Sequence, residues 1–476
     1  MRKILFFLLF VSSLNSFSQY DDKWKEVYRN ELDGKIKSAQ EEVQEIYKKA
    51  KRKNDEVQII KCFFYLSKFE QVFDEKAQST IIKNLQQEIE EAKPTSKAIL
   101  KYVYLSVLQQ YYQRNNYIIN KRTSLESKKN KDFLTWTKTD FNFEIEKNYD
   151  NLLSNENELR NTSIEKIKEV FDISSSVDIK NYSVYDFLAQ KKGDYLKSTI
   201  SSWKQKKSTD FESEIQIFYE NSVSFVKYNA KKLEDNNLKE LITLLQNNEK
   251  YYLNQKNYEK LDFAYYERLK FIKETFWNEE FYLNKVVSLE KTTTNLFLKQ
   301  FLRVDRARYY YNQTYKNGKI NSYNSALKLV DTILNAKVNV NALAEAEKIK
   351  IEINNKNLEI TLPKTSYPKQ NIRAFVDFKN IDSLTISYYE LPQKLNYLFK
   401  NYYYNNSNKF NKDSIINTFI SKNKAIKTQK VILPNKHDYF EYTTEILLEK
   451  LDIGNYLIFI ETLNDTITNK KVFTYN

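Results

Sequence analysis

The side chains with the strongest intrinsic reactivity are scarce in this chain. Cys62 is the only cysteine and His437 the only histidine among 476 residues. A hydrolytic nucleophile–histidine pair would have to use His437, whose surroundings, NKHDY, are typical of an exposed turn. Cys62 lies in the apolar stretch IIKCFFYLSKF, which favours a buried thiol over a reactive one. We predict that neither residue is catalytic.

Other catalytic and ligand-binding motifs are also missing from the sequence. A lone cysteine excludes an intramolecular disulfide and a cysteine-based metal site. We find no HExxH motif, no pair of histidines and no glycine-rich phosphate loop. Acidic residues number 62, so any chosen pair of carboxylates says little about glycoside hydrolysis. We therefore predict no enzyme activity, no metal and no cofactor.

Tyrosine-rich clusters are better candidates for binding. They are YYQRNNY at 111–117, RYYYNQTY at 308–315 and NYYYNNSNKF at 401–410. Flat amphipathic rings give contact area at a low cost in conformational entropy. We expect the first two clusters to pack between helices. In the third, Tyr402, Tyr403 and Tyr404 are the predicted binding surface, for a peptide or a glycan.

A fourth motif concerns folding. Asp452, Gly454 and Tyr456 have the spacing of a tyrosine corner and stand just before the strand-like run YLIFIETL. We expect the Tyr456 hydroxyl to bond to nearby backbone. We also expect Gly454 to provide a tight turn with φ values that a Cβ would resist.

Helical periodicity dominates the first three quarters of the chain. Ile36, Ala39, Val43, Ile46 and Ala50 recur at steps of three and four, which predicts one apolar stripe. Similar stripes follow at 100–111, 238–245, 261–272 and 327–334 and are separated by short polar turns. We predict a tetratricopeptide-like solenoid of helical hairpins over 19–356.

Near residue 357, the spacing of the apolar residues changes from the helical period to every second residue. We expect strands near 358–362, 372–379, 383–390, 426–433, 439–447, 455–463 and 468–475. Seven short strands in this length predict an immunoglobulin-like β-sandwich over 357–476. An insertion at about 392–424 is expected to be partly helical. The fold class is thus multidomain, α then β.

The N-terminus predicts export. Arg2 and Lys3 precede eight apolar residues, and small residues follow up to Ser18, which is the layout of a signal peptide over 1–18. We expect a periplasmic or extracellular protein without a membrane-spanning segment. The net charge is +14, but lysines and acids are interspersed, so we predict no nucleic-acid partner.

Four segments together resemble a known family. They are GKIKSAQEEVQEIYKKAKRKNDEVQIIKCFFYLSKF (34–69), YSVYDFLAQKKGDYL (182–196), LEITLPKTSYPKQNIRAFVDFKNIDSLTISYYEL (358–391) and EILLEKLDIGNYLIFIE (445–461). With the signal peptide, they resemble the N-terminal part of the large macroglobulin-like proteins of the Bacteroidota, relatives of alpha-2-macroglobulin.

The resemblance implies that 357–476 is a first macroglobulin-type domain. Phe63 and Phe64 follow Cys62, so the family's thioester motif is absent, and one sandwich leaves no place for a bait region. The implied function is a non-catalytic protein-binding scaffold or a truncated inhibitor of endopeptidases. Its partner would be a protein, such as a protease or an envelope protein. The alternative is a glycan-binding surface module that uses the tyrosines at 402–404.

Overall fold

The computed structural model describes residues 20–70, 75–123, 133–168, 170, 182–200, 215–276, 278–317, 322–363, 367–400, 412–462 and 468–475. The chain forms two compact units, Met1–Leu298 and Lys299–Asn476, which we call unit 1 and unit 2. Unit 1 is helical, and unit 2 joins helices to antiparallel sheets. The predicted signal peptide at 1–18 lies outside the described residues, and the domain limits at 18 and 356 remain predictions.

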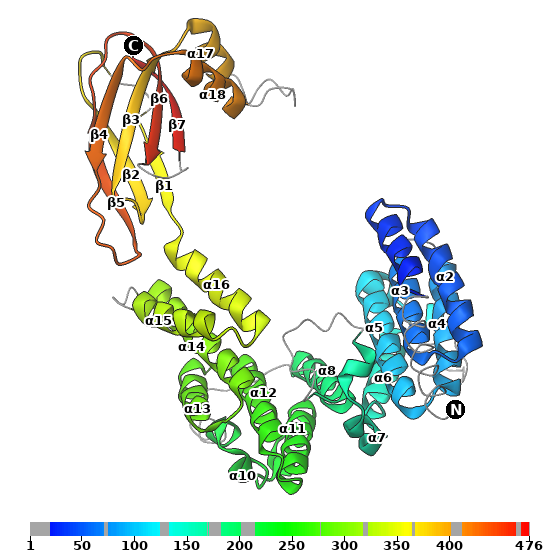
Figure 1. Cartoon of the computed structure of the whole chain (residues 1–476). Helices are drawn as coiled ribbons and strands as arrows, with labels where there is room; N and C mark the ends of the chain where they lie inside the picture. The colour runs from blue at the N-terminus through cyan, green and yellow to red at the C-terminus, as the bar shows by residue number, and fades with distance from the viewer. Residues whose placement is uncertain are drawn as a thin grey trace, which may run out of the picture. The chain divides into compact units, whose positions relative to one another are not determined.

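The described helices of unit 1 run from residue 20 to residue 292 (Figure 1). They are a helix over 20–32, α2 (Ile36–Lys53), α3 (Glu56–Glu70), α4 (Glu75–Glu91), α5 (Pro94–Ile119), α6 (Lys138–Asp150), α7 (Glu156–Asn161), α8 (Val184–Thr199), a helix over 215–219, α10 (Ser222–Phe225), α11 (Asn236–Asn254), α12 (Tyr258–Phe276) and α13 (Glu279–Thr292).

Helix α2 shows why these segments pair. Ala39, Val43, Ile46 and Ala50 are its buried residues, so the predicted stripe is confirmed. Gly34, with φ of +73°, makes the turn from the preceding helix, a conformation that residues with a Cβ rarely adopt. Neighbouring helices then bury their stripes against each other: α2 packs on α3, α4 on α5, and α11 on both α8 and α12.

Arg268 joins three helical segments of unit 1. Its side chain is fully buried, and its Nε donates to Glu249 Oε1 of α11 at 2.6 Å. Nη1 donates to the carbonyl of Phe218, and Nη2 donates to the carbonyl of Glu220 at 2.7 Å. The guanidinium lies 3.9 Å from the ring centre of Phe225. This buried charge therefore has a carboxylate, two carbonyls and an aromatic face around it.

Unit 2 begins within a helix and ends in strands. Its elements are α14 (Leu296–Asn317), α15 (Ser322–Ala336), α16 (Val340–Asn354), β1 (Asn357–Thr361), β2 (Ile372–Lys379), β3 (Ser383–Glu390), α17 (Gln393–Lys400), α18 (Lys412–Lys422), β4 (Lys427–Ile432), β5 (Glu441–Leu448), β6 (Gly454–Thr462) and β7 (Thr468–Tyr475). The predicted strands are confirmed to within two residues at their ends.

The strands form two antiparallel sheets, of order β1-β2-β5 and β4-β3-β6-β7. Register is fixed by pairs such as Val376 with Thr444 and Ile386 with Ile460. Val376 and Ile386 come from different sheets and are buried in one shared cluster. The alternation of buried and exposed residues along β2 is what a strand with one buried face requires.

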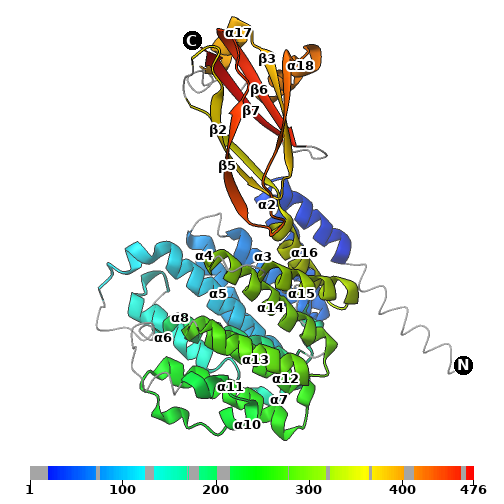
Figure 2. The same cartoon turned by 90° about the vertical axis from the view of Figure 1, so that its left-hand side faces the viewer.

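Two short helices cover the other face of the second sheet. Ile416 and Phe419 of α18 pack with Tyr389 and Leu457, whose side chains alternate with the shared core along β3 and β6. Figures 1 and 2 place α17 and α18 near one end of the strands. The insertion predicted at 392–424 is therefore helical in its described parts.

The helices of unit 2 and the strands share contacts. Tyr439 and Phe440, between β4 and β5, pack with Tyr323 and Val330 of α15. The amide of Asn380, just after β2, donates to the carbonyls of Ile353 and Asn355 at 3.0 Å. The helices α14 to α16 thus belong to the same compact unit as the sheets. Within the described residues, we find no helix with both the length and the apolar character that a bilayer crossing needs.

Candidate functional site

The candidate site begins at the N-terminus of α8, where the sequence S-V-Y-D forms a capping box. The backbone N–H of Asp186 donates to Ser183 Oγ at 3.2 Å, and the N–H of Ser183 donates to Asp186 Oδ2 at 3.0 Å. Two otherwise unpaired backbone N–H groups are thereby satisfied. The cap also fixes the Asp186 carboxylate in a buried position.

Two tyrosines contact Asp186, Tyr252 at its carboxylate and Tyr182 at its backbone carbonyl. The Tyr252 hydroxyl of α11 lies 2.8 Å from each carboxylate oxygen of Asp186 and donates to them. Burial first, and then the charge of Asp186, raises the pKa of Tyr252 well above its usual range. The Tyr182 hydroxyl lies 3.3 Å from Gln190 Oε1, and its pKa is also raised, mainly by burial. Both hydroxyls therefore stay protonated and act as donors.

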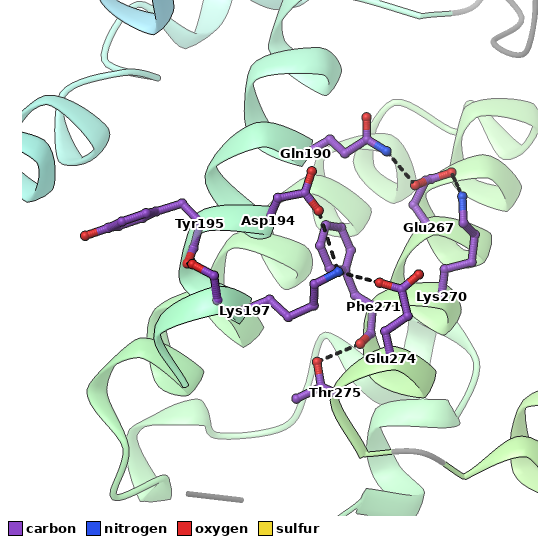
Figure 3. Close-up of polar contacts among 10 residues, drawn as sticks. Gln190, Asp194, Tyr195, Lys197, Glu267, Lys270, Phe271, Glu274 and Thr275 are labelled. Atoms are coloured by element: carbon purple, nitrogen blue, oxygen red, sulfur yellow. Dashed lines mark hydrogen bonds and ion pairs between the residues drawn. The ribbon is translucent and has the colours of Figure 1, made fainter. Parts of the chain in front are cut away.

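A polar clamp joins α8 to α12 (Figure 3). Gln190 Nε2 donates to Glu267 Oε2 at 3.1 Å, and Lys270 Nζ donates to the other oxygen of Glu267 at 3.2 Å. Two turns further along α8, Lys197 forms an ion pair with Glu274 of α12. These contacts fix how the two helices face each other.

Gly193 allows α8 to approach α12 closely. A Cβ at this position would lie 2.8 Å from Cζ of Phe271, a separation that real Cβ atoms do not show. The aromatic ring of Phe271 can therefore lie against the backbone of α8 only because residue 193 has no side chain.

A pocket lies where α8, α11 and α12 meet. Its residues are Tyr182, Asp186, Ala189, Gln190, Leu244, Leu245, Asn248, Tyr252, Lys260, Phe263, Ala264, Glu267 and Phe271. The pocket is partly open to solvent and has about 50 Å³ of space for the centres of water-sized atoms. One water needs roughly 10–15 Å³ of such space, so the pocket holds a short chain of heavy atoms. Small residues, Ala189 and Ala264, leave this space between the larger side chains.

Arg160 of α7 forms a second layer behind the pocket. Its side chain is 1% exposed, and its guanidinium lies 3.6 Å from the ring centre of Tyr185 and 4.0 Å from that of Tyr251. Nε donates to Glu156 at 2.7 Å, and Nη1 donates to Asn248 Oδ1 at 2.9 Å. In the described part of the chain, Nη2 has no hydrogen-bond partner. Asn248 is therefore oriented by a charged group outside the pocket.

The residues predicted from the sequence lie elsewhere. In unit 2, the Tyr456 hydroxyl donates to the carbonyl of Asp452 at 3.1 Å. The expected reason for Gly454 is wrong, because its φ is not in the left-handed region. Instead, a Cβ on Gly454 would lie 3.1 Å from the Tyr456 hydroxyl oxygen, so the glycine makes room for the tyrosine. The predicted surface at 402–404 lies outside the described residues.

The two rare side chains have unreactive surroundings. Cys62 is buried in the core of the first hairpins, and burial raises the pKa of its thiol well above the usual range. His437 is an exposed turn residue with φ of 55°, and its Nε2 lies 3.7 Å from an oxygen of Asp382. Both placements agree with the sequence-based interpretation. Among the described residues, no cluster of three or more His, Cys, Asp or Glu side chains is placed to hold a metal ion.

Comparisons with known proteins assign no family to this chain. No family model and no curated protein matches the chain. Among solved structures, the alkylpurine DNA glycosylase AlkC of Pseudomonas fluorescens, bound to DNA containing an abasic site analog, matches with a TM-score of 0.19 and 10% identity. The match covers 88% of this chain and 97% of that one. A likeness this low transfers neither fold nor activity.

These findings correct several predictions. The resemblance to macroglobulin-like proteins is wrong, since no family model and no curated protein supports it. The functions implied by it, a protein-binding scaffold or an inhibitor-type molecule, are withdrawn with it, as is the glycan-binding alternative. The predictions of no enzyme activity and no nucleic-acid partner are also withdrawn, since neither the structure nor the comparisons establish these absences.

Proposed function

We propose that unit 1 binds a small organic ligand with an apolar body in the pocket between α8, α11 and α12. The observation that carries this proposal is the space between these helices, which is bounded by apolar side chains such as Leu244 and Phe263 and by polar groups already fixed by hydrogen bonds. Ligand sites are commonly concave and mainly apolar, with a few polar groups that fix orientation. The volume suits a ligand of about the size of one amino-acid side chain.

Filling the pocket tests the proposal. Ala264 of α12 lines the pocket and is buried, so Ala264→Leu should occupy the space without lowering helix propensity much. The probes are pentanoate, pentanol, pentanamide and pentylamine, and binding to the full chain is measured by ligand-observed NMR. We expect at least one probe to bind the native chain in the millimolar range, about −4 kcal/mol, and to lose binding to Ala264→Leu.

Tyr258→Leu is the matched control, because Tyr258 lies on the same helix and is 63% exposed. The control should bind the probe as the native chain does. If Ala264→Leu retains full binding, or if no probe binds the native chain, the proposed pocket function is wrong.

We also propose a finer description of the fold. Pairing of α2 with α3, α4 with α5 and α11 with α12 supports a tetratricopeptide-like arrangement in unit 1. The single core between the two sheets supports an immunoglobulin-like sandwich in unit 2.

Export is a further proposal, supported by the layout of residues 1–18. Expression of the full chain in a Gram-negative bacterium should yield a periplasmic protein that starts at Gln19. Mass spectrometry of the recovered protein measures this, and a cytoplasmic product that still carries residues 1–18 would contradict export.

A further inference from the structure

The polar groups of the pocket differ in how fully they are paired. Asp186 accepts from the N–H and hydroxyl of Ser183 and from the Tyr252 hydroxyl. Glu267 accepts from Gln190 on one oxygen and from Lys270 on the other. Both carboxylates of the pocket therefore already have donors of their own.

Asn248 presents a donor to the pocket. An arginine can only donate hydrogen bonds, so the bond from Arg160 Nη1 identifies the bonded Asn248 atom as the amide oxygen. The Nδ2 group of Asn248 is then left for the pocket, and within the described residues it has no acceptor. Asn248 is half-buried and lines the pocket, so a ligand can take the place of water at this donor.

Lys260 presents a second donor. Its side chain is half-buried at the pocket, and its Nζ lies 5.8 Å from the ring centre of Tyr252, which is one helical turn after Asn248 on α11. No carboxylate in the described part of the chain pairs with Lys260. An ammonium group beside a pocket and without a paired carboxylate is a natural position for an anionic ligand group.

We propose that the pocket selects ligands that carry a carboxylate at one end, held by Lys260 Nζ and Asn248 Nδ2, with the apolar body between α8 and α12. This inference rests on the proposed function, because it names the chemical class of ligand for the same pocket. Arg160 is a positioning residue in this arrangement, because it acts through the orientation of Asn248 and does not line the pocket.

The charges around the pocket are compatible with an anion. Asp186 is surrounded by its three donor groups, and Glu267 is paired with Lys270. Arg160 lies behind Asn248 and is also paired with Glu156. Lys260 is thus the cation of this set that a ligand carboxylate can neutralise.

Ligand chemistry gives the first test. The native full chain should bind pentanoate at least about tenfold more tightly than pentanol, pentanamide or pentylamine. The reason is that the free energy of a charge-assisted hydrogen bond exceeds the free energy of a tenfold change in Kd. Titration calorimetry or ligand-observed NMR measures the four affinities. Pentylamine or pentanol binding as tightly as pentanoate would overturn the inference.

Two variants give the second test. Lys260→Met removes the charge but keeps the length of the side chain, and Asn248→Asp replaces the donor with an acceptor while preserving a partner for Arg160. Each variant should weaken the binding of pentanoate at least about tenfold and leave the binding of pentanol unchanged. Lys250→Met, at an exposed position of α11, is the matched control and should change neither affinity.

The outcomes separate the two proposals. If Lys260→Met and Asn248→Asp both bind pentanoate as the native chain does while Ala264→Leu abolishes binding, the carboxylate assignment fails and the pocket function stands. If Ala264→Leu also binds pentanoate normally, the pocket function itself fails. Circular dichroism of each variant shows whether the helices have formed, and Asn248→Asp serves where Lys260→Met does not fold.

Discussion

Arg268 and Arg160 are both buried in unit 1, but their surroundings differ. Arg268 has a two-point ion pair with Glu249 and two backbone carbonyls, so its guanidinium is well satisfied. Arg160 has one oxygen of Glu156 and the amide of Asn248, and its Nη2 has no partner among the described residues. Both lie against aromatic rings.

The difference separates an anchor from a positioning group. A buried charge whose hydrogen bonds are all made stabilises one packing arrangement. A buried charge with an unpaired N–H group is tolerated where the residue also has a functional role. Arg268 joins α11, α12 and the residues around 218–220 without lining the pocket. Arg160 instead fixes the pocket residue Asn248, 88 positions further along the chain.

The largest expected effect is the loss of Arg268. Arg268→Met leaves the Glu249 carboxylate buried without a counter-charge, which should lower the free energy of unfolding of unit 1 by about 3–5 kcal/mol. Denaturant unfolding monitored by circular dichroism measures it. Because the penalty comes from the unpaired charge, the double variant Arg268→Met with Glu249→Leu should recover part of the loss. A single variant that costs less than about 1 kcal/mol would remove the distinction between the two arginines.

A smaller effect is expected at Arg160. Glu156 is 49% exposed and can be solvated after Arg160→Met, so we expect a loss of only about 1–2 kcal/mol from the bond to Asn248 and the aromatic contacts. Pentanoate affinity should fall as well, because the Asn248 amide is then free to rotate. Unfolding and titration are measured on the same preparation. A stability loss equal to that of Arg268→Met would show that Arg160 is an anchor too.

The smallest effect is expected at the caps of two helices. Ser183→Ala in α8 and Thr137→Ala in α6 each remove one capping box and should cost about 1 kcal/mol. Only Ser183→Ala should also weaken the binding of pentanoate, because Ser183 holds Asp186 in the pocket. Thermal unfolding and pentanoate titration measure both quantities. If the two variants change the affinity for pentanoate equally, the α8 cap has no role in the site.

The sequence predicts the elements well because local periodicity carries the information. The stripe of α2 and the strands β1 to β7 follow from spacing alone. The capping box at 183–186 is also readable in the sequence, and it marks the start of the helix that lines the pocket. The same segment, 182–196, was part of the family resemblance that the comparisons do not support.

The pocket and its supports could not be predicted in this way. Periodicity can place a small residue on a buried face, but it does not show that Ala189 and Ala264 line one pocket. The contact of Gly193 with Phe271 and the bond of Arg160 to Asn248 join residues 78 and 88 positions apart. Gly454 illustrates the same limit: the motif was readable, but the reason for the glycine is a side-chain contact and not a backbone angle.

A crystal structure of the full chain grown with pentanoate tests the central claim most directly. The account predicts pentanoate between α8, α11 and α12, with its carboxylate within hydrogen-bond distance of Lys260 Nζ and Asn248 Nδ2. Pentanoate bound only elsewhere, or with its carboxylate turned away from both donors, would contradict it.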